Sequence, residues 1–141
     1  MEFVSLDVFL NFDGDCRAAL SFYADVFGLA APENPVTYGQ APGFSGPEED
    51  RDRIIYAGLP IFGCNVMLSD RPSGPGYIKG NNIALTLGTD DAGEIERLYA
   101  ALSAGGTVKM ELGKTFFSEL YAMVTDRFEI TWQLSLTRFE P

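Results

Sequence analysis

The sequence predicts an α+β protein made of two similar modules, each with a strand, then a helix, then two or three further strands. The main evidence is an internal repeat. The helix-like segment DCRAALSFY, at residues 15–23, follows the apolar run VFLNF, and DAGEIERLY, at residues 91–99, follows NIALTLGT. Runs in which apolar and polar residues alternate come after both segments, as in half-buried strands. A duplicated strand–helix–strands module therefore accounts for the chain.

Length and composition limit both the fold and the function. The chain has 141 residues, of which 46% are hydrophobic, and this fits one globular domain with a substantial core. Its 20 acidic and 10 basic residues give a net charge of −10, so we expect no nucleic-acid partner. We also expect no membrane partner, because no apolar run approaches the roughly 18 residues that indicate a membrane span.

The start of the chain and its cysteines predict a cytoplasmic protein. The opening MEFVSLDVFLNF has an acidic residue where a signal peptide has a basic region. Cys16 and Cys64 each lie inside an apolar pattern, so we interpret both as reduced core residues. The chain has no histidine, which removes the commonest general base and the commonest ligand of transition metals.

We expect helices at about residues 15–28 and 91–104. Asp15 and Asp91 stand where an N-cap is needed, and Glu94 would complete a capping box. Glycines at the ends of both segments favour termination there. The predicted buried stripes are Ala19, Phe22, Tyr23 and Val26 in the first helix, and Ile95, Leu98, Tyr99 and Leu102 in the second.

Strand-like runs follow each predicted helix. The first half offers residues 53–59 and 62–69, which we expect to be joined by a tight connection near Pro60. The second half offers residues 107–112 and a hairpin within residues 119–134. Each module therefore has the strands to form one small sheet.

The Gly- and Pro-rich stretch at residues 71–81 has the composition of a linker. We therefore expect one domain over residues 1–141, with module one at about 1–70 and module two at 82–141. The other irregular stretch, residues 30–52, is too long for a simple connection. It is predicted to hold a short edge strand near Val36, and its remainder is either a mobile lid or a surface loop without a role.

A helix packed on one face of each sheet leaves the opposite face free. If the two sheets curl towards each other, the free faces form a cup lined by the polar sides of the strands. Alternation places several residues on that lining. They are Asp7, Phe9 and Asn11; Asn65, Met67 and Ser69; Asn82, Ala84 and Thr86; and Thr131 and Gln133.

Four stretches of the sequence resemble successive blocks of one family. They are FDGDCRAALSFYADVFG, IIYAGLPIFGCNVMLSD, GNNIALTLGTDD and TFFSELYAMVTDRFEITWQL. They are similar to the PhnB-like branch of the vicinal oxygen chelate superfamily, which includes glyoxalase I, bleomycin-resistance proteins and extradiol dioxygenases. The resemblance implies paired βαβββ modules, a cupped mixed β-sheet with helices on its convex face, and usually a homodimer. Some relatives carry a 3-demethylubiquinone methyltransferase label, but no Gly-rich methyl-donor site is present here.

The resemblance also implies where a metal would be held. Enzymes of the superfamily bind a divalent metal in the cup through His, Glu or Gln from four strands. Those positions fall here on Asp7 (or Val8, if no residue is inserted), near Met67 or Ser69, on Asn82 and on Gln133. One carboxylate and neutral amides are weak ligands, so we expect no transition metal and no cofactor. Magnesium could still bind weakly through Asp7 and waters.

Two functions remain open. The favoured hypothesis is a metal-free protein that binds a small organic molecule in the cup. Its candidate pocket residues are Asp7, Phe9, Tyr56, Asn65, Ser69, Asn82, Phe117, Tyr121 and Gln133. The alternative is a lyase or dioxygenase that uses a metal at Asp7, or an enzyme with Asp7 or Tyr56 as its acid–base group.

Overall fold

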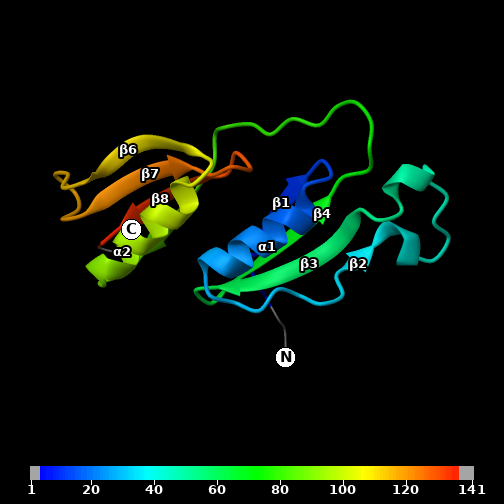
Figure 1. The fold of residues 1–141 in the computed structure, drawn as a ribbon, viewed down its shortest axis with the longest axis horizontal. Helices are drawn as coiled ribbons and strands as arrows, with labels where there is room; N and C mark the ends of the chain where they lie inside the picture. Colours follow the sequence, from blue (N-terminus) through cyan, green and yellow to red (C-terminus); the bar gives the residue numbers. More distant parts are fainter. Residues whose placement is uncertain (1–3, 137–141) are drawn as a thin grey trace. The chain divides into compact units, whose positions relative to one another are not determined.

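The computed structural model describes residues 4–136 and divides the chain into two compact modules, Met1–Tyr77 and Ile78–Pro141. The boundary falls inside the predicted linker. Each module contains one four-stranded mixed sheet and one helix packed on it, so the predicted α+β class and the duplication are confirmed (Figure 1). The prediction that both sheets form one cup stays a prediction.

The first module has strand order β1-β4-β3-β2, with β1 parallel to β4 and the other pairs antiparallel. Helix α1 packs on β3 and β4. The elements are β1 (Val8–Phe12), α1 (Cys16–Val26), β2 (Val36–Thr37), β3 (Ile54–Ile61) and β4 (Cys64–Asp70), with short 3-10 helices at Tyr38–Gln40 and Glu48–Asp50.

The second module repeats this topology with strand order β5-β8-β7-β6, and β5 is parallel to β8. Helix α2 packs on β6, β7 and β8. The elements are β5 (Ala84–Gly88), α2 (Ala92–Ser103), β6 (Thr107–Gly113), β7 (Tyr121–Thr125) and β8 (Thr131–Ser135). In both modules the strand after the first crossover lies at the outer edge.

Each core lies between a helix and the helix-facing side of its sheet. The buried side chains include Ala19, Leu20, Tyr23, Val26, Leu59, Val66 and Leu68 in the first module, and Ile95, Leu98, Leu102, Ala122, Val124, Trp132 and Leu134 in the second. The predicted stripes are therefore confirmed except at Phe22 and Tyr99, which are only partly buried. Their positions lie at the margin of the stripe, where the sheet covers part of the ring.

The two helices begin differently, and one predicted cap is wrong. The Asp15 side chain makes no capping hydrogen bond; instead Asp70 Oδ1 accepts from Gly14 N at 2.8 Å and Cys16 N at 3.0 Å. The parallel β1–β4 pairing brings the end of β4 to the start of α1, so a distant carboxylate takes the place that the sequence assigned to a local one.

In α2 the predicted cap is confirmed, since Asp91 Oδ1 accepts from Glu94 N at 3.2 Å. The reciprocal half of the predicted capping box is wrong. The Glu94 carboxylate pairs with Arg97 at 2.7 Å, and Thr89 Oγ1 accepts from Asp91 N at 3.2 Å. The ion pair with a residue three positions on competes for the same carboxylate.

Two predictions at the β3–β4 hairpin are wrong. Pro60 lies within β3, and the turn is at Phe62 and Gly63, whose φ angles are 48° and 79°. Cys64 is exposed, although its alternation predicted a core position, because it follows the turn directly and lies at the margin of the sheet. Cys16 is buried as predicted.

The segment at residues 30–52 contains the predicted edge strand, β2 at Val36–Thr37. Polar contacts bind part of the rest to the first module, and its role as a lid or as a surface loop without a role stays a prediction. The Tyr38 hydroxyl donates to the Asp70 carbonyl at 2.8 Å, and Arg53, which follows the segment, pairs with Asp13 at 2.8 Å. No local pattern predicts these contacts, because their partners lie far along the chain.

The linker is bound at both of its ends. Arg71 N donates to the Phe12 carbonyl at 2.7 Å and the Tyr77 hydroxyl to the Asn11 carbonyl at 2.8 Å, both within the first module. Lys79 pairs with Glu129 of the second module at 2.5 Å. In the described part of the chain, no helix is long and apolar enough to cross a membrane.

Candidate functional site

The free face of a sheet is the face opposite its helix. In the second module Gln133 lies at the centre of this face, because it pairs with Thr86 of β5 on one side and with Met123 of β7 on the other. Its chain neighbours Trp132 and Leu134 are buried on the helix side. Alternation along β8 therefore directs the Gln133 side chain away from α2.

The Gln133 amide is partly buried, and it makes no hydrogen bond with any residue in the range 4–136. The Thr86 hydroxyl beside it is exposed and likewise makes no hydrogen bond with the described residues. By contrast, the Thr125 and Thr131 hydroxyls on this face bond each other at 2.9 Å. A side-chain amide offers both donors and an acceptor, so Gln133 and Thr86 are the polar groups that this face leaves available.

Thioethers lie beside Gln133. Met123 is its direct cross-strand neighbour, and Met110 of the edge strand β6 pairs in turn with Met123. Met110 remains 44% exposed. Flexible thioethers adapt to flat apolar surfaces and make favourable contacts with aromatic rings, so this part of the face is suited to a ring-shaped ligand.

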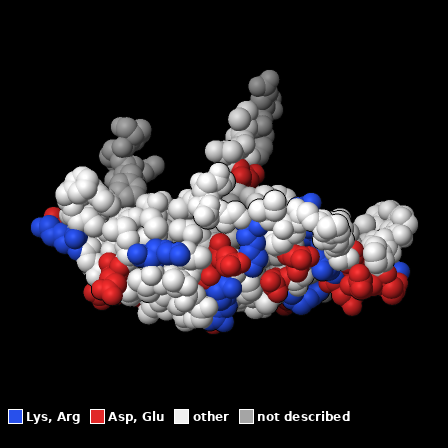
Figure 2. Space-filling view, turned by 90° about the horizontal axis from the view of Figure 1, so that it is seen from above, with Lys and Arg blue, Asp and Glu red and all other residues white. Residues whose placement is uncertain are grey.

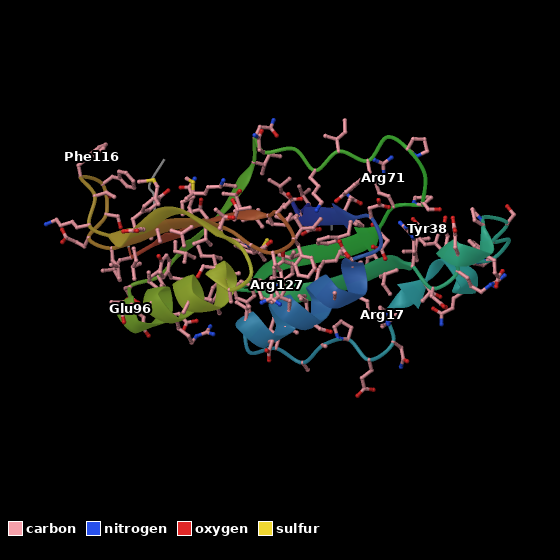
Figure 3. The ribbon with its side chains drawn as sticks, turned by 45° about the horizontal axis from the view of Figure 1, so that its top comes forward. Arg17, Tyr38, Arg71, Glu96, Phe116 and Arg127 are labelled. Atoms are coloured by element: carbon pink, nitrogen blue, oxygen red, sulfur yellow. The ribbon has the colours of Figure 1, made fainter. Side chains whose placement is uncertain are left out.

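Aromatic rings border one end of the same face. Tyr121 lies two residues before Met123 on β7, so it is a diagonal neighbour of Gln133. The Phe117 ring contacts the Tyr121 ring edge to face, with 5.0 Å between centroids, and Phe116 contacts Phe117 at 5.1 Å. Burial raises the pKa of Tyr121, which keeps the phenol neutral. Phe116 lies at the tip of the loop and is fully exposed (Figure 3).

The loop between β6 and β7 holds Phe117 in place through a small polar network. Ser118 is buried, its hydroxyl donates to the Leu120 carbonyl at 2.9 Å, and it accepts from the Ser135 hydroxyl at 3.0 Å. The Thr115 hydroxyl accepts from Ser118 N at 3.1 Å. These contacts fix the loop that carries Phe117 relative to β8, the strand that carries Gln133.

Asn82 does not lie on this face as predicted. The strand was expected to include it, but β5 begins at Ala84, and Asn82 lies in the exposed bend before the strand. The segment at residues 78–83, which leads into β5, does not pair with β8. Two predicted metal positions of this module, Asn82 and Gln133, are therefore not on neighbouring strands.

The first module presents a second free face. Phe9 pairs with Met67, and Asn11 with Ser69, whose hydroxyl donates to the Asn11 side chain at 3.0 Å. Val8 pairs with Val66, which is buried on the helix side, so the first-strand register that had been left open favours Asp7 for the free face.

The remaining predicted residues of the first module are spread over its margins. Asp7 lies before β1, is exposed and accepts from the Ser5 hydroxyl at 3.2 Å. Tyr56 lies on β3 and is 49% exposed, and Asn65 is exposed beside Pro60. Met67 and Ser69 are buried and the Ser69 hydroxyl is bonded to Asn11, so the free polar groups of this face lie at its margins.

Neither free face is rich in charge. Among the described strands the only basic residue is Lys109 on the edge strand β6, and the acidic ones are Asp70 and Glu111. The Asp70 carboxylate accepts from the start of α1. Within residues 4–136 no three His, Cys, Asp or Glu side chains come together in a way that could hold a metal ion. Figure 2 shows acidic and basic side chains interspersed, without a continuous basic stripe.

Residues 5–134 match the Glyoxalase/Bleomycin resistance protein/Dioxygenase superfamily. The chain belongs to this superfamily. It is 27% identical to Protein YjdN of Escherichia coli (strain K12), over 96% of this chain and 97% of that protein. The solved structure of PA1353 from Pseudomonas aeruginosa is 32% identical with a TM-score of 0.77, covering 94% of this chain and 97% of that one.

The PhnB protein from Bacillus cereus has the same fold. Its solved structure is 21% identical with a TM-score of 0.72, and the match covers 94% of this chain and 98% of that one. The resemblance to the superfamily, with PhnB-like proteins among its structural neighbours, is thus confirmed.

Three residues of the second free face were absent from the predicted pocket: Thr86, Met110 and Met123. Alternation placed Thr86 on the lining, but only the β5–β8 register brings it beside Gln133. The methionines depend on the β6–β7 register, which contains two irregularities that no local pattern reveals.

Proposed function

We propose that this protein binds a small organic molecule against the free face of its second sheet, without a metal. The observation that carries the proposal is the Gln133 amide, which is partly buried yet makes no hydrogen bond with the described residues. An accessible amide at the centre of a sheet face, whose donors and acceptor the described residues leave unused, favours a ligand. The thioether of Met123 supplies apolar contact beside it, and the ring of Phe117, which packs on the buried Tyr121, supplies more at the end of the face.

The kinds of side chain on this face explain why the proposed ligand site includes no metal. The free face of the second sheet offers an amide, hydroxyls and thioethers, and first-row metals of ordinary affinity need about three good ligands such as imidazole, thiolate or carboxylate. Asp7, the one carboxylate of the predicted set, belongs to the other module. We therefore keep metal-dependent lyase or dioxygenase activity as the outcome that would replace this proposal.

The proposal can be tested without knowing the ligand. Purified protein is equilibrated with a small-molecule extract of its own host, washed on a filter and denatured, and the released molecules are identified by mass spectrometry. We expect the native protein to retain a molecule that the variant Gln133→Leu loses. The matched control is Glu96→Gln, at an exposed position of α2 (labelled in Figure 3), and it should retain the molecule fully.

Two results would contradict the proposal. One is retention of nothing by the native protein, or equal retention by Gln133→Leu. The other is one equivalent of a transition metal per chain by elemental analysis, lost in Asp7→Ala. The second result would make the metal-dependent enzyme the better hypothesis.

We also propose that two copies associate. Strands β1, β2, β5 and β6 are the outer strands of their sheets, and outer strands are pairing surfaces unless something covers them. Large apolar side chains lie exposed next to two of these strands, at Leu6 (97% exposed) before β1 and at Ile83 (75%) before β5. Light scattering at micromolar concentration should give twice the chain mass, and a monomer would contradict this proposal.

A further inference from the structure

We infer that the ligand of the second free face is an uncharged planar ring that carries a carboxamide or lactam group, and that anions are rejected. This inference rests on the proposed function, because it specifies the occupant of the same face. It follows from the charges, the polar groups and the apolar groups that the β5–β8 sheet presents.

Charge is the first argument. Gln133, Thr86, Thr125 and Thr131 are neutral, and the only charged side chains on these four strands are Lys109 and Glu111. Both lie on the edge strand β6, separated from β8 by β7, and their charges offset each other. An anion at Gln133 would lose water without gaining a cation, in a chain whose net charge of −10 already repels it.

Hydrogen bonding is the second argument. An amide side chain recognises a carboxamide or lactam with two parallel bonds, because each group has one donor and one acceptor side by side. A carboxylate lacks the donor and would leave the Gln133 carbonyl unpaired; a hydrocarbon would leave the whole amide unpaired. The Thr86 hydroxyl, on the neighbouring strand, can serve a further polar atom of the ligand.

Shape is the third argument. Met123 and Met110 continue from Gln133 towards the sheet edge, and Tyr121 with Phe117 border the diagonal side. Thioethers and ring edges both contact flat π-systems favourably. Phe117 is 41% exposed although it is held against Tyr121, so it can contact a ligand without losing its own support.

The test uses three probes that share a pyridine ring and differ in charge: nicotinamide, nicotinate and the N-methylated nicotinamide cation. Binding is measured by titration while the side-chain amide signals of Gln133 are followed by NMR in ¹⁵N-labelled protein. We expect nicotinamide to shift these signals, and nicotinate to bind at least about tenfold more weakly, as a difference of about 1.4 kcal/mol predicts.

Variants separate recognition from folding. Gln133→Leu should weaken nicotinamide binding at least about tenfold, whereas Gln133→Glu keeps the shape, adds a negative charge and should make the cation the preferred probe. Phe117→Ala should weaken binding of nicotinamide, and its matched control Phe116→Ala should not, since Phe116 is fully exposed at the tip of the loop. Each variant is checked for a native NMR spectrum first.

Some outcomes would overturn the inference. If nicotinate binds the face as tightly as nicotinamide, or if none of the probes moves the Gln133 signals, the assigned ligand class is wrong. The proposed function would stand or fall separately on the molecule that the native protein retains from host extract. Loss of nicotinate binding in Lys109→Gln would show that the edge lysine, not Gln133, selects the ligand.

Discussion

The two modules share one strand order. They differ in how far apart in the sequence the partners of their internal hydrogen bonds lie. In the first, the start of α1 is bound by Asp70, which lies 54 positions beyond Cys16 in the sequence. In the second, the start of α2 is bound by Asp91, three positions before its donor Glu94. The comparison shows that the same topology can be fixed by distant contacts in one copy of a repeat and by local contacts in the other.

The edge strands β2 and β6 also differ, both in length and in how far along the chain their contacts lie. β2 has two residues and is followed by a long segment that bonds back to the end of β4 through Tyr38. β6 has seven residues and pairs directly with β7. The outer strand of the second module is therefore the longer one, although its pairing with β7 has two register irregularities.

Replacing Asp70 with Ala should have the largest effect. Its buried carboxylate accepts from Gly14 N, Cys16 N and Ile54 N, at 2.8, 3.0 and 3.0 Å. Each buried donor left unpaired costs about 1–3 kcal/mol, so we expect the free energy of unfolding of the first module to fall by at least about 3 kcal/mol. Urea unfolding followed by alkylation of buried Cys16 reports on this module, and a loss below about 1 kcal/mol would contradict the role assigned to Asp70.

Asp126→Ala should cost less, about 2 kcal/mol, in the second module. Its buried carboxylate also accepts three bonds, from Phe128 N, Ile130 N and Trp132 Nε1, but the two backbone donors are only part-buried, so water can replace the carboxylate there. Trp132 is the single tryptophan, so its fluorescence reports unfolding of this module alone. If Asp126→Ala lowered the free energy of unfolding as much as Asp70→Ala, the sequence separation of the bonded residues would not govern stability.

The pH dependence of the first module should come from Cys16. Burial, and after it the charge of Asp70, raises the pKa of this thiol from 9.0 to about 12. The folded state then keeps a proton that the unfolded state loses, so the stabilisation is complete below pH 9 and is lost as pH rises towards 12. At pH 10 the free energy of unfolding should be about 1.4 kcal/mol lower than at pH 8.

Cys16→Ala is the control for this effect, since it should remove most of the loss between pH 8 and pH 10. The exposed Cys64 provides a second check. At pH 8 the native protein should react quickly with an alkylating agent at Cys64 and not at Cys16. Equal labelling of both thiols in the native protein would show that Cys16 is not protected.

The smallest effects should come from the two helix starts. Asp91→Ala removes a side-chain cap and should destabilise the second module by about 1 kcal/mol. Asp15→Ala removes no capping bond, so the first module should lose less than about 0.5 kcal/mol. Thermal unfolding of the two variants measures both effects. A larger loss of stability in Asp15→Ala than in Asp91→Ala would contradict the assignment of the α1 cap to Asp70.

Much of the fold followed from periodicity. The alternation of β8 placed Trp132 and Leu134 in the core and Gln133 on the opposite face, and the helical spacing of Ile95, Leu98 and Leu102 gave the buried side of α2. These positions are predictable because side-chain direction depends only on local backbone geometry. The predicted positions of Cys64 and Asn82 were wrong for a related reason. Alternation assumes a continuous strand covered along its whole length, whereas Cys64 is the first residue of β4, directly after the turn, and Asn82 lies before β5 begins.

The sequence by itself determined the duplicated module, the elements within it, the face on which most strand residues lie and the absence of histidine ligands. These depend on residue type and spacing, which are local properties. Only the tertiary structure decided which strands are neighbours, and hence that Thr86 and Met123 lie beside Gln133, that Met110 follows, and that Asp70 binds the start of α1. Pairing across a sheet joins residues far apart in the chain, so its register is set by packing and turn geometry that no single segment encodes.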